Sequence, residues 1–432
     1  MSLYSSKIKT QLVDAVVNIS NNRLEYKLPP MSGFYPTLRL AQFGSTGGDV
    51  AYNKGCGALA LISRISLMNG AEELSSLSEA NRYMSFKYLN SSNSDNASLF
   101  YPLIHHQQGY LINDKLKVQS SHQAEYNQAG AGDSALLQGQ KAVTVDLMSM
   151  LPVLSSIPVL DTSVFSDLRI QIEYETDSRK VLHDNTAAFA TRVDPVLVCE
   201  EIQDPKLVAA LSSKFSGTVW NEIEHDVINL PANDNANDTE LVQRIKETVN
   251  GFDNKYVSRM VMMKTFSNRE KSKIAGAGAV QRGFGDFNSY AMHKEKINFA
   301  VNGKSLFVGD GLDTPAKRQM MLHDTWGSCN VVPFGHVEAV GVDGSAASTQ
   351  LVGVPVLTGT KQGEQVGTQD YVGVHLEGRI NQFEVEYERA TPKNDDAVQA
   401  VDQLGEALDL HMFCEIRKQL VIQNGRYVLQ YV

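Results

Sequence analysis

The chain has 432 residues, of which 42% are hydrophobic and 20% are charged, a balance typical of folded domains and not of disordered proteins. Its formal net charge of −10 argues against nucleic-acid binding as the main role, because phosphate contacts require a basic surface. The sequence contains no run of about 18 apolar residues, so no membrane span is predicted. The start MSLYSSKIKT lacks the apolar core of a signal peptide.

Strand patterns dominate the chain, and the length fits two domains. Strands are predicted at Ala58–Leu67, Val143–Leu147, Leu168–Glu175, Val196–Glu200, Tyr256–Met263, Leu351–Leu357, Phe383–Glu388 and Tyr427–Tyr431. Hairpin turns are predicted at Asn69-Gly70, Asn250-Gly251, Asn302-Gly303 and Asn424-Gly425, because both residues of an Asn-Gly pair accept a positive φ. Helices are predicted at Asp204–Phe215, Thr239–Val249 and Asp395–Leu408.

Two strand motifs recur across the chain. The stretch IQIEYET begins at Ile170 and FEVEYER begins at Phe383, 213 residues later, while Cys199 and Cys414 follow them at an offset of 215. A looser pair, ISLMNGAEEL from Ile65 and INFAVNGKSL from Ile297, is offset by about 233. These matches predict two similar β domains in tandem, joined near Asp204–Phe215, with Tyr174 equivalent to Tyr387. The alternative is that unrelated β-strands simply resemble one another.

The repeated strands also share a pattern of faces. Ile170, Ile172 and Tyr174 lie on one face, as do Phe383, Val385 and Tyr387, and the opposite faces are predicted to be wet. The wet faces carry Gln171, Glu173, Glu175, Glu384, Glu386 and Glu388. One buried and one wet face is typical of a sandwich of antiparallel sheets.

Polar stretches and cysteines complete the outline. Three long loops are predicted, Asn90–Gln140, Ser267–Asp286 and Gly341–Asp370, and such loops usually carry function or contacts. The wide spacing of Cys56, Cys199, Cys329 and Cys414 argues against zinc and against a disulfide framework. Cys199 and Cys414 lie in apolar strands and are predicted to be free, buried thiols.

Candidate catalytic and binding motifs are weak. Gly303-Lys304-Ser305 resembles the end of a phosphate-binding loop, but Asn298 stands where that loop needs glycine. Gly276 and Gly278 lack the third glycine of a dinucleotide site, and Asn233–Glu240 lacks the glycine of a calcium loop.

Two further groups of side chains have an alternative reading. His105, His106 and His122 share one long loop, where an exposed polar surface is favoured over a metal site. Glu384, Glu386 and Glu388 could form a carboxylate pair for glycoside cleavage, since residues two apart on a strand lie about 6.5–7 Å apart. A solvated sheet face explains them equally. No catalytic, cofactor-binding or metal-ligating residue is therefore assigned.

Three stretches resemble double jelly-roll major capsid proteins of the polinton and adintovirus, virophage and large DNA virus lineage. They are GALALISRISLMNGAEELSSL from Gly57, LPVLSSIPVLDTSVFSDLRIQIEYE from Leu151, and HMFCEIRKQLVIQNGRYVLQYV from His411. The resemblance implies an all-β fold of two tandem eight-stranded jelly rolls with long inserted loops and a few short helices. The expected divisions are an N-terminal segment at residues 1–40, a first jelly roll at 41–210 and a second at 211–432.

The resemblance also implies a function without catalysis. The expected protein is a structural capsid subunit of the virion that forms pseudo-hexameric homotrimers, which tile an icosahedral shell. Expected partners are neighbouring capsomers, penton and minor capsid proteins, with no cofactor and no sequence-specific nucleic-acid binding. Residues 1–40, with a net charge of +3, could contact an internal membrane or the genome.

The alternative function is a β-sandwich protein that binds or cleaves polysaccharide. Such a protein would cluster aromatic residues with carboxylates, whereas Trp220 and Trp326 both lie outside the acidic strand.

Overall fold

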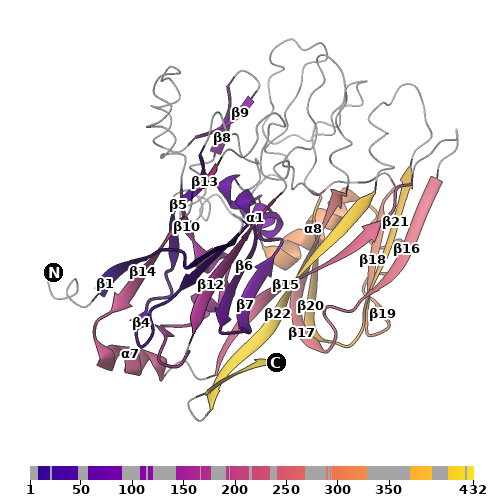
Figure 1. Ribbon diagram of the computed structural model, residues 1–432. Coiled ribbons are helices and arrows are strands. Elements are labelled where there is room, and N and C mark those ends of the chain that lie inside the picture. Colours follow the sequence, from indigo (N-terminus) through magenta and orange to yellow (C-terminus); the bar gives the residue numbers. More distant parts are fainter. Residues whose placement is uncertain are drawn as a thin grey trace. The chain divides into compact units, whose positions relative to one another are not determined.

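The computed structural model describes most strands of the chain and the short helices between them (Figure 1). The described residues are 8–19, 22–46, 57–89, 108–112, 115–119, 143–165, 167–176, 191–193, 195–213, 217–233, 241–267, 289, 292, 294–327, 370–391, 407–423 and 426–432.

The chain divides into two compact units. The first contains Met1–Met84, Asn96–Glu224 and Ile416–Val432, and the second contains Ser85–Asp95 and His225–Glu415. The expected division at residues 40 and 210 stays a prediction, although strands already occur within residues 8–34.

The N-terminal half forms two sheets and a separate hairpin. Its strands are β1 (Ile8–Val13), β2 (Val17–Ile19), β3 (Arg23–Lys27), β4 (Gly33–Phe34), β5 (Arg39–Thr46), β6 (Ile62–Asn69), β7 (Glu72–Ser78), β8 (Gln108–Ile112), β9 (Lys115–Gln119), β10 (Val143–Asp146), β11 (Leu160–Asp161), β12 (Leu168–Tyr174), β13 (Thr191–Val193) and β14 (Val196–Ile202). The seven-stranded sheet has the order β10-β5-β14-β4-β11, with β1 on β14 and β13 on β5. A five-stranded sheet has the order β2-β3-β12-β6-β7, and β8 pairs with β9.

The C-terminal half also forms two sheets. Its strands are β15 (Thr218–Leu230), β16 (Leu241–Val249), β17 (Lys255–Phe266), β18 (Lys296–Val301), β19 (Lys304–Ser305), β20 (Val372–Ile380), β21 (Phe383–Thr391), β22 (Leu408–Gln423) and β23 (Arg426–Tyr431). One sheet has the order β15-β22-β17-β20, with β23 on β22, and the other has the order β16-β21-β18-β19.

Eight strands recur in both halves with the same chain order and the same neighbours. The order β1-β14-β5-β10 matches β15-β22-β17-β20, and the order β3-β12-β6-β7 matches β16-β21-β18-β19. Two four-stranded sheets interleaved in this way are a jelly roll. The predicted all-β fold of two tandem eight-stranded jelly rolls is therefore confirmed.

Strand pairing fixes which residues of the two jelly rolls are equivalent. The hairpins β6–β7 and β18–β19 both leave two residues in the turn, after Asn69 and after Val301 respectively. Asn69 pairs with Leu168, and Val301 pairs with Phe383, so the offset of these strands is 215 (383 − 168). Cys199 and Cys414 share that offset. The predicted equivalence of Tyr174 and Tyr387 is therefore wrong by two residues: Tyr387 corresponds to Ile172.

Three of the four Asn-Gly predictions match antiparallel hairpins. Asn69-Gly70 joins β6 to β7, and Asn302-Gly303 joins β18 to β19, where both residues have a positive φ. Gln423 pairs with Arg426 on either side of residues 424–425, which lie outside the described residues. The hairpin predicted at Asn250-Gly251 is wrong, because the strands before and after it, β16 and β17, belong to different sheets.

Among the described residues, helices are few and short. The structure has the helices α1 (Ala80–Leu89), α5 (Pro152–Ser156), α7 (Pro205–Ser212) and α8 (Pro315–Trp326), and the 3-10 turns η1 (Gly57–Leu61) and η5 (Leu147–Ser149). The predicted start of α7 is confirmed, since the Asp204 side chain accepts hydrogen bonds from the N–H groups of Lys206 and Leu207. Within the described ranges, no helix has both the length and the apolar character needed to cross a bilayer.

Two predicted elements have a different structure. The helix predicted at Thr239–Val249 is wrong, because Leu241–Val249 is strand β16 and pairs along its length with β21. Leu241, Ile245 and Val249 recur every four positions, a spacing that fits one face of a helix and one face of a strand equally. The strand predicted from Ala58 begins at Ile62, after η1. Residues 351–357 and 395–406 lie outside the described residues.

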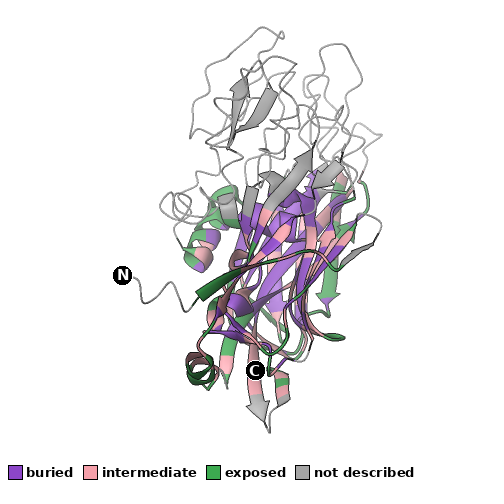
Figure 2. Ribbon diagram, turned by 60° about the vertical axis from the view of Figure 1, so that its left-hand side comes forward, coloured by how far each residue is buried: buried purple, intermediate pink, exposed green. Residues whose placement is uncertain are grey.

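Buried residues alternate with less buried ones along central strands such as β12. The buried residues are purple in Figure 2. Ile170, Ile172 and Tyr174 are buried on β12, and the equivalent face of β21 is also buried, as predicted. Glu175 departs from the pattern because the pairing of β12 with β6 shifts after Glu173, and its side chain is buried.

Cys199 and Cys414 are both buried and neither forms a disulfide, as predicted. Burial raises the pKa of the Cys199 thiol to about 12. Cys56 and Cys329 lie outside the described residues.

The loop before α8 offers a matched test of close backbone packing. Gly309 and Gly311 both have a positive φ, but a Cβ on Gly311 would overlap the carbonyl oxygen of Ile297, whereas none of the described atoms lies near a Cβ on Gly309. Gly309→Ala should therefore cost only the strain of its backbone conformation, about 1 kcal/mol. Gly311→Ala should cost clearly more in urea unfolding, and equal losses would contradict the overlap.

Candidate functional site

The acidic row of β21 lies on the outer face of the four-stranded sheet. Lys246 of the neighbouring strand β16 lies 3.1 Å from a carboxylate oxygen of Glu384 and 2.9 Å from one of Glu386. Arg244 lies 2.5 Å from Glu388 in the same way. Each carboxylate thus has a basic partner across the strand pair, which is the arrangement of a solvated sheet face.

The other motifs from the sequence do not come together. Gly303, Lys304 and Ser305 lie in the exposed β18–β19 hairpin and not at the start of a helix. His105, His106, His122, Gly276 and Gly278 lie outside the described residues, as do residues 234–240. The described part of the chain contains no group of three or more His, Cys, Asp or Glu side chains that could hold a metal ion.

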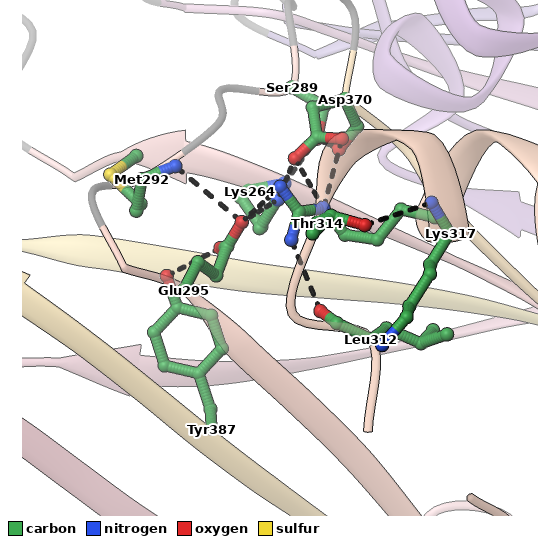
Figure 3. A network of polar contacts seen from close by, with 10 residues as sticks. Lys264, Ser289, Met292, Glu295, Leu312, Thr314, Lys317, Asp370 and Tyr387 are labelled. Atoms are coloured by element: carbon green, nitrogen blue, oxygen red, sulfur yellow. Dashed lines mark hydrogen bonds and ion pairs between the residues drawn. The ribbon is translucent and has the colours of Figure 1, made fainter. Parts of the chain in front are cut away.

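A buried charge cluster, which sequence analysis missed, lies in the second jelly roll (Figure 3). It consists of Lys264, Glu295, Arg318 and Asp370, whose side chains are 5% exposed or less. The Lys264 Nζ lies 2.7 Å from Glu295 Oε2 and 2.5 Å from Asp370 Oδ2. Arg318 donates from Nε to both oxygens of Asp370 and lies 3.2 Å from Glu295. Every charge in the cluster therefore has two opposite charges beside it.

Hydrogen bonds complete the cluster. The Tyr387 hydroxyl donates to Glu295 Oε1 at 2.8 Å, and Arg318 Nη1 donates to the carbonyl oxygen of Leu312 at 3.1 Å. The Ser289 hydroxyl accepts from the Lys264 backbone N–H and donates to the Asp370 carbonyl oxygen. Such satisfaction is required of buried charges, because an unpaired one is strongly destabilising.

The cluster joins elements that are far apart in sequence. Lys264 is on β17, Arg318 is on α8, and Glu295 immediately precedes β18. Ser289 and Asp370 are the first described residues after residues 268–288 and 328–369 respectively. The cluster and Ser289 therefore tie these two positions to β17, α8 and the start of β18.

The ion pairs shift the pKa values of Asp370 and Arg318 toward their charged forms. Burial alone would raise the pKa of Asp370, but Lys264 and Arg318 together hold it below its ordinary value. Burial also opposes the charge on Arg318, yet Glu295 and Asp370 raise its pKa above the ordinary value. Burial, followed by the Glu295 carboxylate, raises the pKa of Tyr387 well above its usual range. These groups act as a structural cross-link, since ion-paired carboxylates without solvent access are poorly placed for acid–base chemistry.

The first jelly roll does not repeat the cluster. Ser63 lies where Glu295 would be expected from the hairpin register (295 − 232), and Ile172 lies where Tyr387 would be. Comparison of the two repeated halves of the sequence therefore could not predict the charge cluster. The one available signal was Lys264 itself, a charge within the stretch VMMKTF, directly after the end of the predicted strand Tyr256–Met263.

The depressed pKa of Asp370 predicts acid sensitivity. A carboxyl group whose pKa is lower in the folded chain stabilises it above the unfolded value, near 3.8, and loses that contribution as the pH falls through the folded value. At neutral pH, the free energy of unfolding should be larger for the wild-type protein than for Asp370→Asn. The difference between the two should shrink below about pH 4. Urea titrations at several pH values would measure it, and a difference independent of pH would contradict it.

Comparison with solved structures identifies the architecture. The chain matches PBCV-1 VP54, in the crystal structure fitted into a reconstruction of the virophage Sputnik, with a TM-score of 0.57 and 11% identity over 98% of this chain and 97% of that chain. The mavirus major capsid protein matches with a TM-score of 0.54 and 8% identity over 100% and 91% of the two chains.

The fold is a double jelly roll. A quasi-atomic model of the PBCV-1 virus capsid also matches it, with a TM-score of 0.52 and 10% identity over 98% of this chain and 96% of that one. At such identities the likeness of the double jelly roll to these structures is a likeness of fold. No protein-family model and no curated protein sequence matches the chain.

Proposed function

We propose that this double jelly-roll chain is a structural major capsid protein of an icosahedral virus. The observation that carries the proposal is the pair of complete jelly rolls in one chain, together with full-length likeness of fold to the mavirus major capsid protein. A capsid protein functions through its shape and its contacts with other subunits, and this function requires no catalytic residue. The ion-paired state of Glu384, Glu386 and Glu388 gives no support to glycoside cleavage.

The proposed capsomer is a homotrimer. Three chains with two jelly rolls each place six similar wedges around one axis, which gives the nearly hexagonal outline that tiles a flat facet. Neighbouring capsomers, penton and minor capsid proteins would be its partners in the virion. Residues 1–40 would contact an internal membrane or the genome through their excess of basic residues.

Sedimentation of the purified protein, followed by electron microscopy, tests the proposal. The expected results are a particle of three chains and, under assembling conditions, sheets or shells with hexagonal packing. A chain that stays monomeric at high concentration and binds a glycan near Glu384–Glu388 would overturn the capsid role in favour of polysaccharide recognition.

The insertion before β20 should matter more for assembly than for folding. We expect deletion of residues 345–365 to weaken trimer formation while leaving the thermal unfolding of each chain nearly unchanged, because long loops can clasp a neighbour while the sandwiches stay closed. The deletion ends before Asp370, so that the buried charge cluster keeps all its members. Sedimentation and thermal unfolding measure the two effects, and a deletion that lowers stability but leaves the trimer intact would contradict the prediction.

A further inference from the structure

Strand β23 has no counterpart in the first jelly roll. The strand β22 has 16 residues, whereas its equivalent β14 has 7, and the additional length carries β23. Lys418–Gln423 of β22 pair with Arg426–Tyr431 of β23 in antiparallel register. Because this hairpin lies outside the eight strands that the fold repeats, closing the jelly roll does not explain it.

The outer edge of β23 is exposed and, after Arg426, uncharged. Among the described strands β23 pairs only with β22, so it is an edge strand to which a further strand could be added. The side chains of Val428, Tyr431 and Val432 are 39%, 52% and 50% exposed.

Two other edge strands, β16 and β20, carry the charges that usually prevent pairing with another chain. The edge strand β16 contains Arg244, Lys246 and Glu247, and β20 contains Glu377 and Arg379. After Arg426, β23 reads Tyr-Val-Leu-Gln-Tyr and has no charge. The edge of β23 therefore lacks the usual protection of an edge strand.

We propose that β23 pairs in antiparallel register with β23 of a second copy of this chain, across a twofold axis between neighbouring capsomers. The inference rests on the proposed capsid function, because a shell of trimers places such axes between its tiles. The sequence of the strand is nearly palindromic about Leu429. In the register centred there, Tyr427 faces Tyr431 of the other copy and Val428 faces Gln430, so no like charges oppose one another.

The two faces of β23 have different roles. Tyr427 packs on Phe165, and its hydroxyl contacts Asn69 and Glu72, while the Tyr431 hydroxyl donates to Glu224. Val428 and Gln430 alternate with these tyrosines and point to the opposite face. Substitutions at positions 428 and 430 therefore change the proposed contact without removing those that hold the hairpin on its own chain.

The contact is too small to act alone. A pairing of about six residues per strand buries much less than the roughly 800 Å² per partner of a stable interface. It is therefore expected only between copies that other contacts already hold side by side, where the effective concentration is high. Free capsomers at low concentration should not dimerise through β23.

Paired charge variants test the register directly. In Val428→Lys/Gln430→Lys, the two introduced lysines of each copy face the lysines of the other, and the protein concentration needed for lattice assembly should rise about tenfold. In Val428→Lys/Gln430→Glu, each introduced lysine faces an introduced glutamate, and assembly should stay close to wild type. Light scattering and electron microscopy measure assembly, while sedimentation and thermal unfolding of the capsomer should match wild type for both variants.

The outcomes separate this inference from the proposed function. If wild type forms no lattice, the capsid role itself fails. If wild type assembles and both variants assemble equally well, β23 makes no contact between copies. If both variants assemble equally poorly, the edge binds something other than its own copy, and self-pairing is overturned.

Discussion

Lys264→Met should destabilise the second jelly roll by about 3–5 kcal/mol, because it leaves Glu295 and Asp370 buried with Arg318 as their only opposite charge in the cluster. Methionine fills nearly the same volume as the aliphatic part of lysine. The loss of stability therefore reflects removal of the charge and not a change in packing. The midpoint of urea unfolding at constant slope measures the change.

Lys296→Met on strand β18, in the other sheet of the same jelly roll, supplies the control. Lys296 forms an ion pair with Asp310 at 2.8 Å, but both side chains are exposed, at 40% and 65%. Solvent screens such pairs, so the stability should barely change. Similar effects of the two substitutions would show that burial does not determine the strength of the Lys264 contacts.

Phe383→Ala should cost a comparable amount, about 3–5 kcal/mol, because it opens a cavity in the core of the second jelly roll. Phe383 is fully buried, stacks on Phe299 with ring centroids 5.8 Å apart, and meets Phe252 edge to face at 6.2 Å. Urea unfolding again measures the loss.

Two variants at the same strand make this result specific. Leu168 occupies the position of Phe383 in the first jelly roll, so Phe383→Leu should retain the apolar contact and lose less than Phe383→Ala. Glu386→Ala, on the outer face, should change stability little. A loss for Phe383→Ala as small as that for Glu386→Ala would contradict the core position.

Local patterns predicted the repeated fold because its strands alternate so regularly. Neighbouring residues were enough to predict the buried faces of β12 and β21 and three of the Asn-Gly hairpins. The register was not, because IQIEYET and FEVEYER match best two residues away from the true alignment, and a shift of two leaves the faces unchanged. Leu241, Ile245 and Val249 likewise fit a helix and a strand, and only pairing with β21 decides between them.

The buried charge cluster shows the other limit. Its members come from residues 264, 295, 318 and 370, which no local pattern connects. Each of these charges is unremarkable in sequence except Lys264, which lies inside an apolar strand. The partners of a buried charge that are distant in sequence are known only from the folded arrangement of the sheets and α8.

The division of the chain into units has a consequence for biosynthesis. The first unit includes Ile416–Val432, which the ribosome makes after the preceding 415 residues. The second jelly roll cannot therefore be completed during synthesis of those residues, because β22 is one of its central strands. The first unit also lacks its last segment until then. Contacts so distant in sequence slow folding and leave strand edges exposed meanwhile. We expect nascent chains that stop before β22 to depend on chaperones and to aggregate when these are depleted.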